Sequence, residues 1–205
     1  MKELLFNEGQ NLKEVLYEIS EYIYHNPELG NQEFKSSEKL ISFLEEHNFI
    51  VEREFLGLKT AFRAVYDSNK PGLTVGYLCE YDALPEIGHG CGHNMIGTMS
   101  AGAGVILSKI LDQVGGRVIV YGTPAEETDG AKVIFAEQGV FEELDAAMML
   151  HPSDKTCASG TSTAIYPLQF RYKGKTAHAA SCPQDGINAL NSVIQLFNGI
   201  DALRQ

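Results

Sequence analysis

Basic side chains are scarce in this chain of 205 residues. Lysine and arginine total 16 against 27 aspartates and glutamates, which gives a formal net charge of −11. A protein this acidic gains nothing by neutralising phosphate groups, so we expect neither nucleic acid nor an anionic membrane as a partner. Cysteine is also rare, with four residues and no CxxC pair. This usage argues against a disulfide framework and favours a reducing, cytoplasmic location.

Long hydrophobic runs and targeting signals are missing as well. The longest stretch without a charged residue, 87–108, contains two histidines, an asparagine and six glycines, unlike a membrane span. The polar N-terminal segment lacks the apolar core of a secretory signal. Hydrophobic residues make up 44% of the sequence and charged residues 21%, which is ordinary for a globular protein with a sizeable core. The length corresponds to between one and two domains.

The hydrophobic period predicts an α/β fold with a largely parallel sheet flanked by helices. Two helices are expected first, at about 12–23 and 37–46, the second capped by Ser36 or Ser37, and then strands at 49–55 and 60–66. Further on, apolar runs at 73–79, 117–121 and 145–150 alternate with helical segments at about 95–113 and 130–138, the latter capped by Asp129. Such alternation is typical of βαβ units.

The pattern changes again after residue 151. A loop at 152–160 is followed by a predicted strand at about 162–172 and a helix at about 185–203. That helix carries an apolar stripe, which needs a sheet several strands wide to cover it. We therefore predict a catalytic domain over residues 1–162 and the beginning of a smaller α+β domain over 163–205. Both are expected to be incomplete.

Candidate metal ligands follow each of the predicted parallel strands. Cys91 and His93 come after the first, Glu126 and Glu127 after the second, and His151 after the third. Because ligands bind at the carboxyl ends of the strands in open α/β sheets, these loops should converge. Cysteine, histidine and carboxylate form a donor set that suits zinc or a similar divalent ion. Gly92 would let the backbone bend so that both of its neighbours reach one centre.

The adjacent glutamates suggest metal-assisted hydrolysis. In an extended or turning backbone they point in different directions, so one can bind the metal while the other faces water. A divalent ion lowers the pKa of bound water to about 7, and a free carboxylate can carry its proton to a leaving nitrogen. Each residue also has a simpler interpretation: Glu126–Glu127 as a solvated surface pair, Cys91 as a structural thiol, and His151 as a strand-end histidine. A plain α/β domain without metal thus stays open.

Six segments resemble the aminoacylase and carboxypeptidase family of co-catalytic metallopeptidases. They read HNPELG at 25–30, EYDALP at 80–85, GHGCGHN at 88–94, PAEE at 124–127, HP at 151–152 and GKTAHAA at 174–180. The branch that they resemble is the amidohydrolases, with aminobenzoyl-glutamate hydrolase, auxin-conjugate hydrolases and a β-alanyl dipeptidase group. EYDALP and GHGCGHN are the most specific segments.

The resemblance implies a role for each matching residue. The expected ligands of one or two Zn²⁺ or Mn²⁺ ions are Cys91, His93, Glu127 and His151. Glu126 would be the general acid/base, Asp82 would orient a ligand, and His178 in the lid domain would reach the substrate. Glu80 stands where other branches place a ligand histidine, so this branch is expected to rely on the Cys91 thiolate.

The implied activity is hydrolysis of amide bonds in small N-acyl amino acids or dipeptides. Family members are longer, with a lid inserted into the catalytic domain and a late histidine ligand supplied by a returning segment. The resemblance therefore predicts a fragment with four of the five ligands, and a homodimer for the full-length enzyme. The alternative expectation is a truncated, inactive protein that binds metal or a partner.

Overall fold

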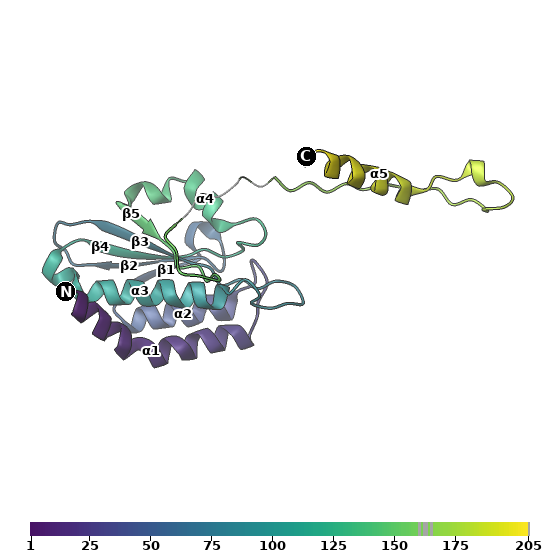
Figure 1. The fold of residues 1–205 in the computed structure, drawn as a ribbon. Coiled ribbons are helices and arrows are strands. Elements are labelled where there is room, and N and C mark those ends of the chain that lie inside the picture. Colours follow the sequence, from purple (N-terminus) through teal and green to yellow (C-terminus); the bar gives the residue numbers. More distant parts are fainter. Residues whose placement is uncertain (160, 162–163, 165, 205) are drawn as a thin grey trace. The chain divides into compact units, whose positions relative to one another are not determined.

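The chain forms two compact units, Met1–Thr156 and Cys157–Gln205. The computed structural model describes residues 1–159, 161, 164 and 166–204. The first unit contains a helix-flanked sheet and all but one of the predicted site residues (Figure 1). The second unit contains a turn, a bridge and one long helix, and each unit is described by itself below.

A five-stranded mixed sheet organises the first unit. Its order is β1-β2-β4-β3-β5, with β3 parallel to both of its neighbours and β2 antiparallel to both of its own. The predicted α/β class is confirmed. The short connection from β1 to β2 allows only an antiparallel pair, whereas helical crossovers make the other strands parallel. The strands are β1 (Ile50–Arg53), β2 (Phe62–Asp67), β3 (Thr74–Cys79), β4 (Arg117–Gly122) and β5 (Ala146–Met148).

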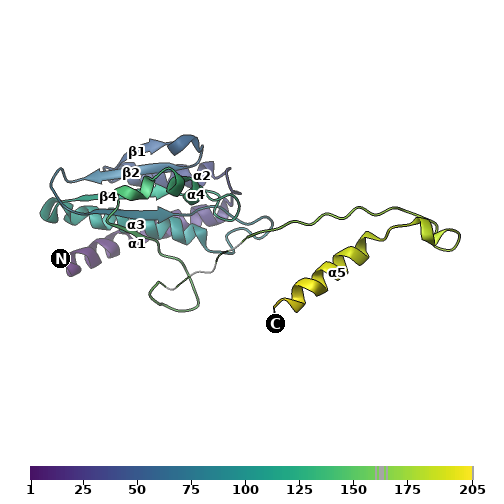
Figure 2. The same ribbon diagram turned by 90° about the horizontal axis from the view of Figure 1, so that it is seen from above.

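Helices cover both faces of this sheet. Three long helices form a layer on one face and α4 lies on the opposite face, as Figure 1 shows and the turned view in Figure 2 supports. The first layer buries Ile23, Leu40 and Leu44, and the second buries Phe135 beside Tyr121. The elements are α1 (Lys2–His25), α2 (Phe34–Glu46), α3 (His93–Val114) and α4 (Ala131–Glu137), with short 3-10 turns at Phe55–Gly57 and Val140–Glu143.

Helix α3 is the central helix of this layer. Among the described residues it alone is long and apolar enough to cross a membrane by length and composition, but 67% of its apolar window is buried inside the protein. Such burial is expected of a core helix. Its glycines permit close packing: a Cβ added at Gly104 would lie 2.5 Å from Cγ2 of Val120 in β4.

Two predicted helix caps are wrong. Helix α2 begins at Phe34, so Ser36 and Ser37 lie inside its first turn. The carboxylate of Glu28 takes their place: one oxygen accepts hydrogen bonds from the Ser36 backbone N–H at 2.8 Å and from its hydroxyl at 2.9 Å. Asp129 does not cap α4 either: the N-cap residue is Gly130, and Oδ1 of Asp129 accepts a hydrogen bond from Nδ2 of Asn31 at 2.9 Å.

The second unit departs from the prediction. Part of the expected strand at 162–172 lies outside the described residues, and the described residues 164 and 166–172 form no strand. A bridge joins Lys175 to Ile187, and α5 (Ala189–Ala202) is capped by the Asn188 side chain, which accepts from the Leu190 N–H at 3.1 Å. The predicted apolar stripe of α5 is exposed, including Phe197. The lid domain stays a prediction.

Candidate active site

Four of the predicted side chains follow three parallel strands at the same edge of the sheet. Asp82 lies beyond β3, Glu126 and Glu127 lie beyond β4, and His151 lies beyond β5. The parallel register sets the last residue of β3 opposite the last residue of β4 and also aligns β3 with β5. The loops therefore leave the sheet together, as βαβ topology requires. Cys91 joins them from the loop that leads into α3.

The loop before α3 brings His93 into this group. His93 is the first residue of α3, and Gly92 before it has a φ of 77°, a left-handed conformation that favours glycine. A Cβ added at Gly92 would lie 2.6 Å from Cγ of Pro152. The Cys91–His93 turn thus packs against the segment that carries His151.

The imidazole of His93 lies at the centre of the site. Its Nδ1 is 2.8 Å from Oδ1 of Asp82, which accepts its hydrogen bond. Its Nε2 faces three carboxylates, at 3.4 Å from Glu80, 3.7 Å from Glu127 and 3.8 Å from Glu126. Because a carboxylate can only accept, Asp82 fixes the tautomer in which Nδ1 carries the proton. Nε2 is then the atom available to a cation.

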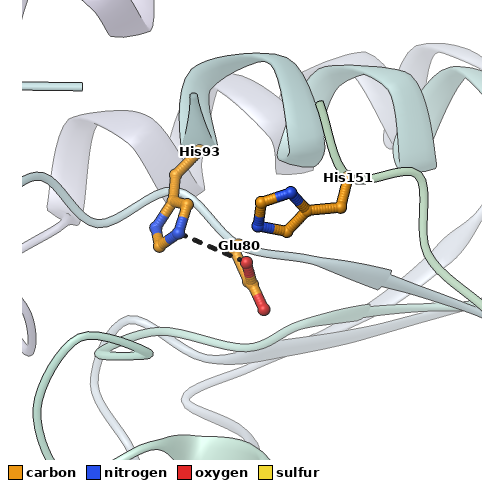
Figure 3. A group of neighbouring side chains, drawn as sticks. All are labelled: Glu80, His93 and His151. Atoms are coloured by element: carbon orange, nitrogen blue, oxygen red, sulfur yellow. Dashed lines mark ion pairs between the residues drawn. The ribbon is translucent and has the colours of Figure 1, made fainter. Parts of the chain in front are cut away.

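Two groups of side chains offer donor atoms close enough to hold one metal ion. Glu80, His93 and His151 form the first, with ligand atoms within 4.8 Å of one another; His93, Glu126 and Glu127 form the second. Figure 3 shows the first group, with the two imidazoles on either side of the Glu80 carboxylate. His93 belongs to both groups, so the two clusters adjoin.

Asp82 links two loops of the site. While Oδ1 accepts from His93, its Oδ2 accepts from the backbone N–H of Glu127 at 3.0 Å. Burial opposes ionisation, yet these hydrogen bonds hold the pKa of Asp82 below its usual range. Burial likewise disfavours the charged form of His93, but Asp82 and the neighbouring glutamates raise its pKa overall. The surrounding carboxylates therefore favour a positive charge beside Nε2 of His93, which either a proton or a bound metal ion would supply.

Glu80 is the member of the cluster that the sequence did not predict as a ligand. It is 2% exposed, and Lys132 of α4 donates a hydrogen bond to its Oε1. Its Oε2 is buried and has no hydrogen-bond partner among the described residues. An orphaned carboxylate oxygen 3.4 Å from His93 Nε2 is the environment that a cation would satisfy. The donors thus fit a divalent metal. Nothing in the sequence singled out Lys132, because several of the predicted helices contain a lysine.

The pKa values of the Glu126 and Cys91 side chains are also raised in this acidic site. Burial, followed by the charge of Glu80, raises the pKa of Glu126. A hydrogen bond with Glu127, followed by burial, raises the pKa of the half-buried Cys91 thiol to about 11. Cys91 belongs to neither donor group found among the described residues. A metal ion would reverse this shift, since a coordinating thiol is deprotonated.

The remaining predicted residue, His178, lies in the second unit. Its side chain is exposed, and its Nδ1 accepts hydrogen bonds from the backbone N–H groups of Ala180 at 3.2 Å and Ser181 at 3.1 Å. Its substrate-binding role stays a prediction. The other thiols, Cys79, Cys157 and Cys182, are free, and Cys79 is buried in the core.

A mixed sheet with carboxylates and histidines at the carboxyl ends of its parallel strands is the arrangement of an α/β domain with its active site at the sheet edge. The family model described as peptidase family M20/M25/M40 matches residues 76–203, more than half of the chain. The chain belongs to this family of peptidases and amidohydrolases, enzymes that hydrolyse amide bonds. The predicted family resemblance is thereby confirmed.

Individual relatives agree. The chain is 38% identical over 200 residues to a Xaa-Arg dipeptidase of Mus musculus, covering 91% of this chain and 46% of that one. It is 36% identical over 208 residues to a p-aminobenzoyl-glutamate hydrolase chain of Escherichia coli (strain K12), covering 92% and 43%. The chain thus spans less than half the length of these relatives.

A solved structure has the same fold. It is a dinuclear metal-binding peptidase of family M20 from Bacillus subtilis, with a TM-score of 0.59 and 24% identity. The likeness covers 67% of this chain and 42% of that one.

Proposed function

We propose that this chain carries the catalytic centre of a metal-dependent hydrolase that cleaves amide bonds in dipeptides or small N-acyl amino acids. The observation that carries the proposal is the convergence of Glu80, Glu126 and Glu127 on Nε2 of His93, at 3.4–3.8 Å. Carboxylates so close to one another repel unless a cation lies between them. The names of the dipeptidase and the aminobenzoyl-glutamate hydrolase among the relatives support the substrate class.

We propose Zn²⁺ or Mn²⁺ as the cation, with His93, Glu127, His151 and Cys91 as ligands and Glu80 as a further oxygen donor. When bound, a divalent ion polarises the scissile carbonyl and lowers the pKa of water in the site. Asp82 keeps Nε2 of His93 free for the ion by holding the proton on Nδ1. Lys132 balances part of the charge of Glu80.

Glu126 is the residue that we propose as general base and acid. Its side chain is 40% exposed, so it can reach substrate and water, and Oε2 lies 3.8 Å from Nε2 of His93. Its pKa is raised by burial and by Glu80, which makes it a better proton acceptor near neutral pH. It would take a proton from the attacking water and return it to the leaving nitrogen.

The test combines metal binding with hydrolysis. The purified chain is stripped with a chelator, reloaded with Zn²⁺ or Mn²⁺, and assayed on Xaa-Arg dipeptides, p-aminobenzoyl-glutamate and N-acyl amino acids. Glu126→Gln should lower turnover by roughly 10²-fold or more, the contribution of a general base, while the bound metal is unchanged. His93→Ala should lose the metal itself. Glu137→Gln, an exposed glutamate on α4, is the matched control and should behave as the parent chain.

Two results would contradict the proposal. Failure of the parent chain to bind either metal would remove its basis. Stoichiometric metal with no hydrolysis of any substrate would favour the alternative, a metal-binding protein without catalysis.

A further inference from the structure

The loop between α1 and α2 contacts the catalytic loops, although no residue in it has a catalytic role in the proposed function. The backbone carbonyl of Glu28 accepts a hydrogen bond from the Ala83 N–H at 2.8 Å, in the loop that follows β3. Gly30 lies against the loop that follows β4: an added Cβ would be 3.1 Å from Cα of Ala125. The loop thus supports both segments that supply the site.

Glu33, at the end of this loop, is the most deeply placed of its side chains. It is fully buried, with 0% of its surface exposed. One carboxylate oxygen accepts a hydrogen bond from the backbone N–H of Ala125 at 2.8 Å, across 92 positions of sequence. The other accepts from the hydroxyl of Thr60 at 2.8 Å. A buried carboxylate with two donors is strongly oriented, because every alternative position would leave it unpaired.

Ala125 needs such a support. Its φ is 60°, in the left-handed region that residues with a Cβ rarely adopt. Such a conformation persists only where the surroundings impose it. Ala125 is also the residue immediately before Glu126.

The residue after Glu126 is held in the same way. The Glu127 N–H donates to Oδ2 of Asp82 at 3.0 Å, as the Ala125 N–H donates to Glu33 at 2.8 Å. The amide groups on both sides of Glu126 are therefore fixed by buried carboxylates from two distant segments. Glu126 itself is 40% exposed and has no hydrogen-bond partner of its own among the described residues, so its backbone determines where its carboxylate lies.

We propose that Glu33 is a positioning residue for catalysis, which holds the Ala125 peptide so that Glu126 faces the reacting water. The inference rests on the proposed function for its catalytic consequence. The hydrogen bond from the Ala125 N–H to the Glu33 carboxylate, which depends on the length of the Glu33 side chain, can be measured without any turnover.

Two substitutions of Glu33 separate the effect of its side-chain length from the effect of its charge. Glu33→Gln keeps the length and an oxygen that can accept from Ala125, while its NH₂ group faces the Thr60 oxygen. Glu33→Asp keeps the charge but withdraws the acceptor by one methylene. Burial raises the pKa of Glu33, so the site disfavours a charge and should accept the neutral amide.

With the metal-loaded chain and the dipeptide that it cleaves best, Glu33→Asp should lower kcat roughly 10- to 100-fold, as misplacement of a catalytic group does. KM and metal stoichiometry should stay within about twofold, since Glu127 keeps its own anchor on Asp82. Glu33→Gln should retain kcat within about threefold of the parent. Thr60→Val is the matched control, because it removes the other partner of Glu33 and leaves Ala125 bound.

Hydrogen exchange of the Ala125 amide provides the readout that does not depend on activity. In the metal-free chain this amide should exchange roughly 10-fold faster in Glu33→Asp than in the parent or in Glu33→Gln. Equal exchange in all three would overturn the inference. Equal kcat in Glu33→Asp and Glu33→Gln, or a loss of thermal stability like that of Thr60→Val with unchanged kcat, would also overturn it. If the parent chain hydrolyses nothing, the proposed function fails while the exchange measurement still decides whether Glu33 holds Ala125.

Discussion

Replacing Asp82 by asparagine tests how the site holds its metal. Asp82 accepts from two donors, the Nδ1–H of His93 at 2.8 Å and the N–H of Glu127 at 3.0 Å. Asparagine has the same shape but a single acceptor oxygen. Its NH₂ group must therefore face one of the two donors, whichever way the amide turns.

The size of the effect follows from the two hydrogen bonds. A hydrogen bond to a buried charged group contributes about 1.5–3 kcal/mol, and one of the two is lost. If the asparagine oxygen faces the Glu127 N–H, its NH₂ group faces His93, and His93 loses the acceptor that fixes its tautomer. Such a change typically costs 10- to 100-fold in metal affinity. We therefore expect Asp82→Asn to weaken Zn²⁺ binding roughly 10- to 100-fold and to lower the unfolding free energy of the metal-free chain by about 2 kcal/mol.

Competition with a chromophoric chelator measures the first quantity, and chemical denaturation in the presence of a chelator measures the second. Asp112→Asn makes the same charge change on an exposed side chain of α3 and serves as the control. Zn²⁺ affinity within about twofold of the parent would refute the assignment of Asp82 as the residue that orients His93.

Two further predictions concern the scaffold. Glu143 accepts a hydrogen bond from Arg63 at 2.7 Å. Its partial burial opposes ionisation, but the contact with Arg63 holds the pKa of Glu143 below its usual value. The ion pair therefore stabilises the fold above pH 4.5, and this stabilisation is lost as the pH falls through the folded pKa. Glu143→Gln should thus lower the unfolding free energy by about 0.5–1 kcal/mol at pH 7. Denaturant titrations should show this difference disappearing as the pH falls below the folded pKa of Glu143, and a difference that stays constant with pH would contradict the assignment. Gly104→Ala places a methyl group 2.5 Å from Val120 and should cost about 1–3 kcal/mol, lowering the melting temperature measured by calorimetry by several degrees. Gly199→Ala in α5 meets open space and should not lower it; an equal fall in both would show that packing of α3 on the sheet is not the cause.

The order of elements in the first unit was predictable because its signals are local. Apolar runs of strand length bounded by turn residues identified β3, β4 and β5, and the helix-length segments between them imposed parallel pairing. Parallel strands in one sheet end at the same edge. The grouping of His93, Glu126, Glu127 and His151 near that edge therefore followed from the sequence.

Other features depended on contacts between distant segments. Glu28 replaces the cap expected from Ser36, and Asn31 donates to the Asp129 carboxylate that was expected to cap α4, because tertiary partners compete with local ones for the same hydrogen bonds. The strand expected at 162–172 rested on a local pattern alone, and a strand requires a partner to which its backbone can bond.

The sequence by itself determined the fold class, the family and most of the residues that meet at the sheet edge, since periodicity and motif spacing are read directly along the chain. Only the tertiary structure decided how these residues act on one another. It turned Glu80 toward His93 at 3.4 Å, gave Asp82 two donors and placed the Glu33 carboxylate against an amide 92 residues away. These arrangements arise from burial, which removes water as an alternative partner and obliges each polar group to find another within the protein.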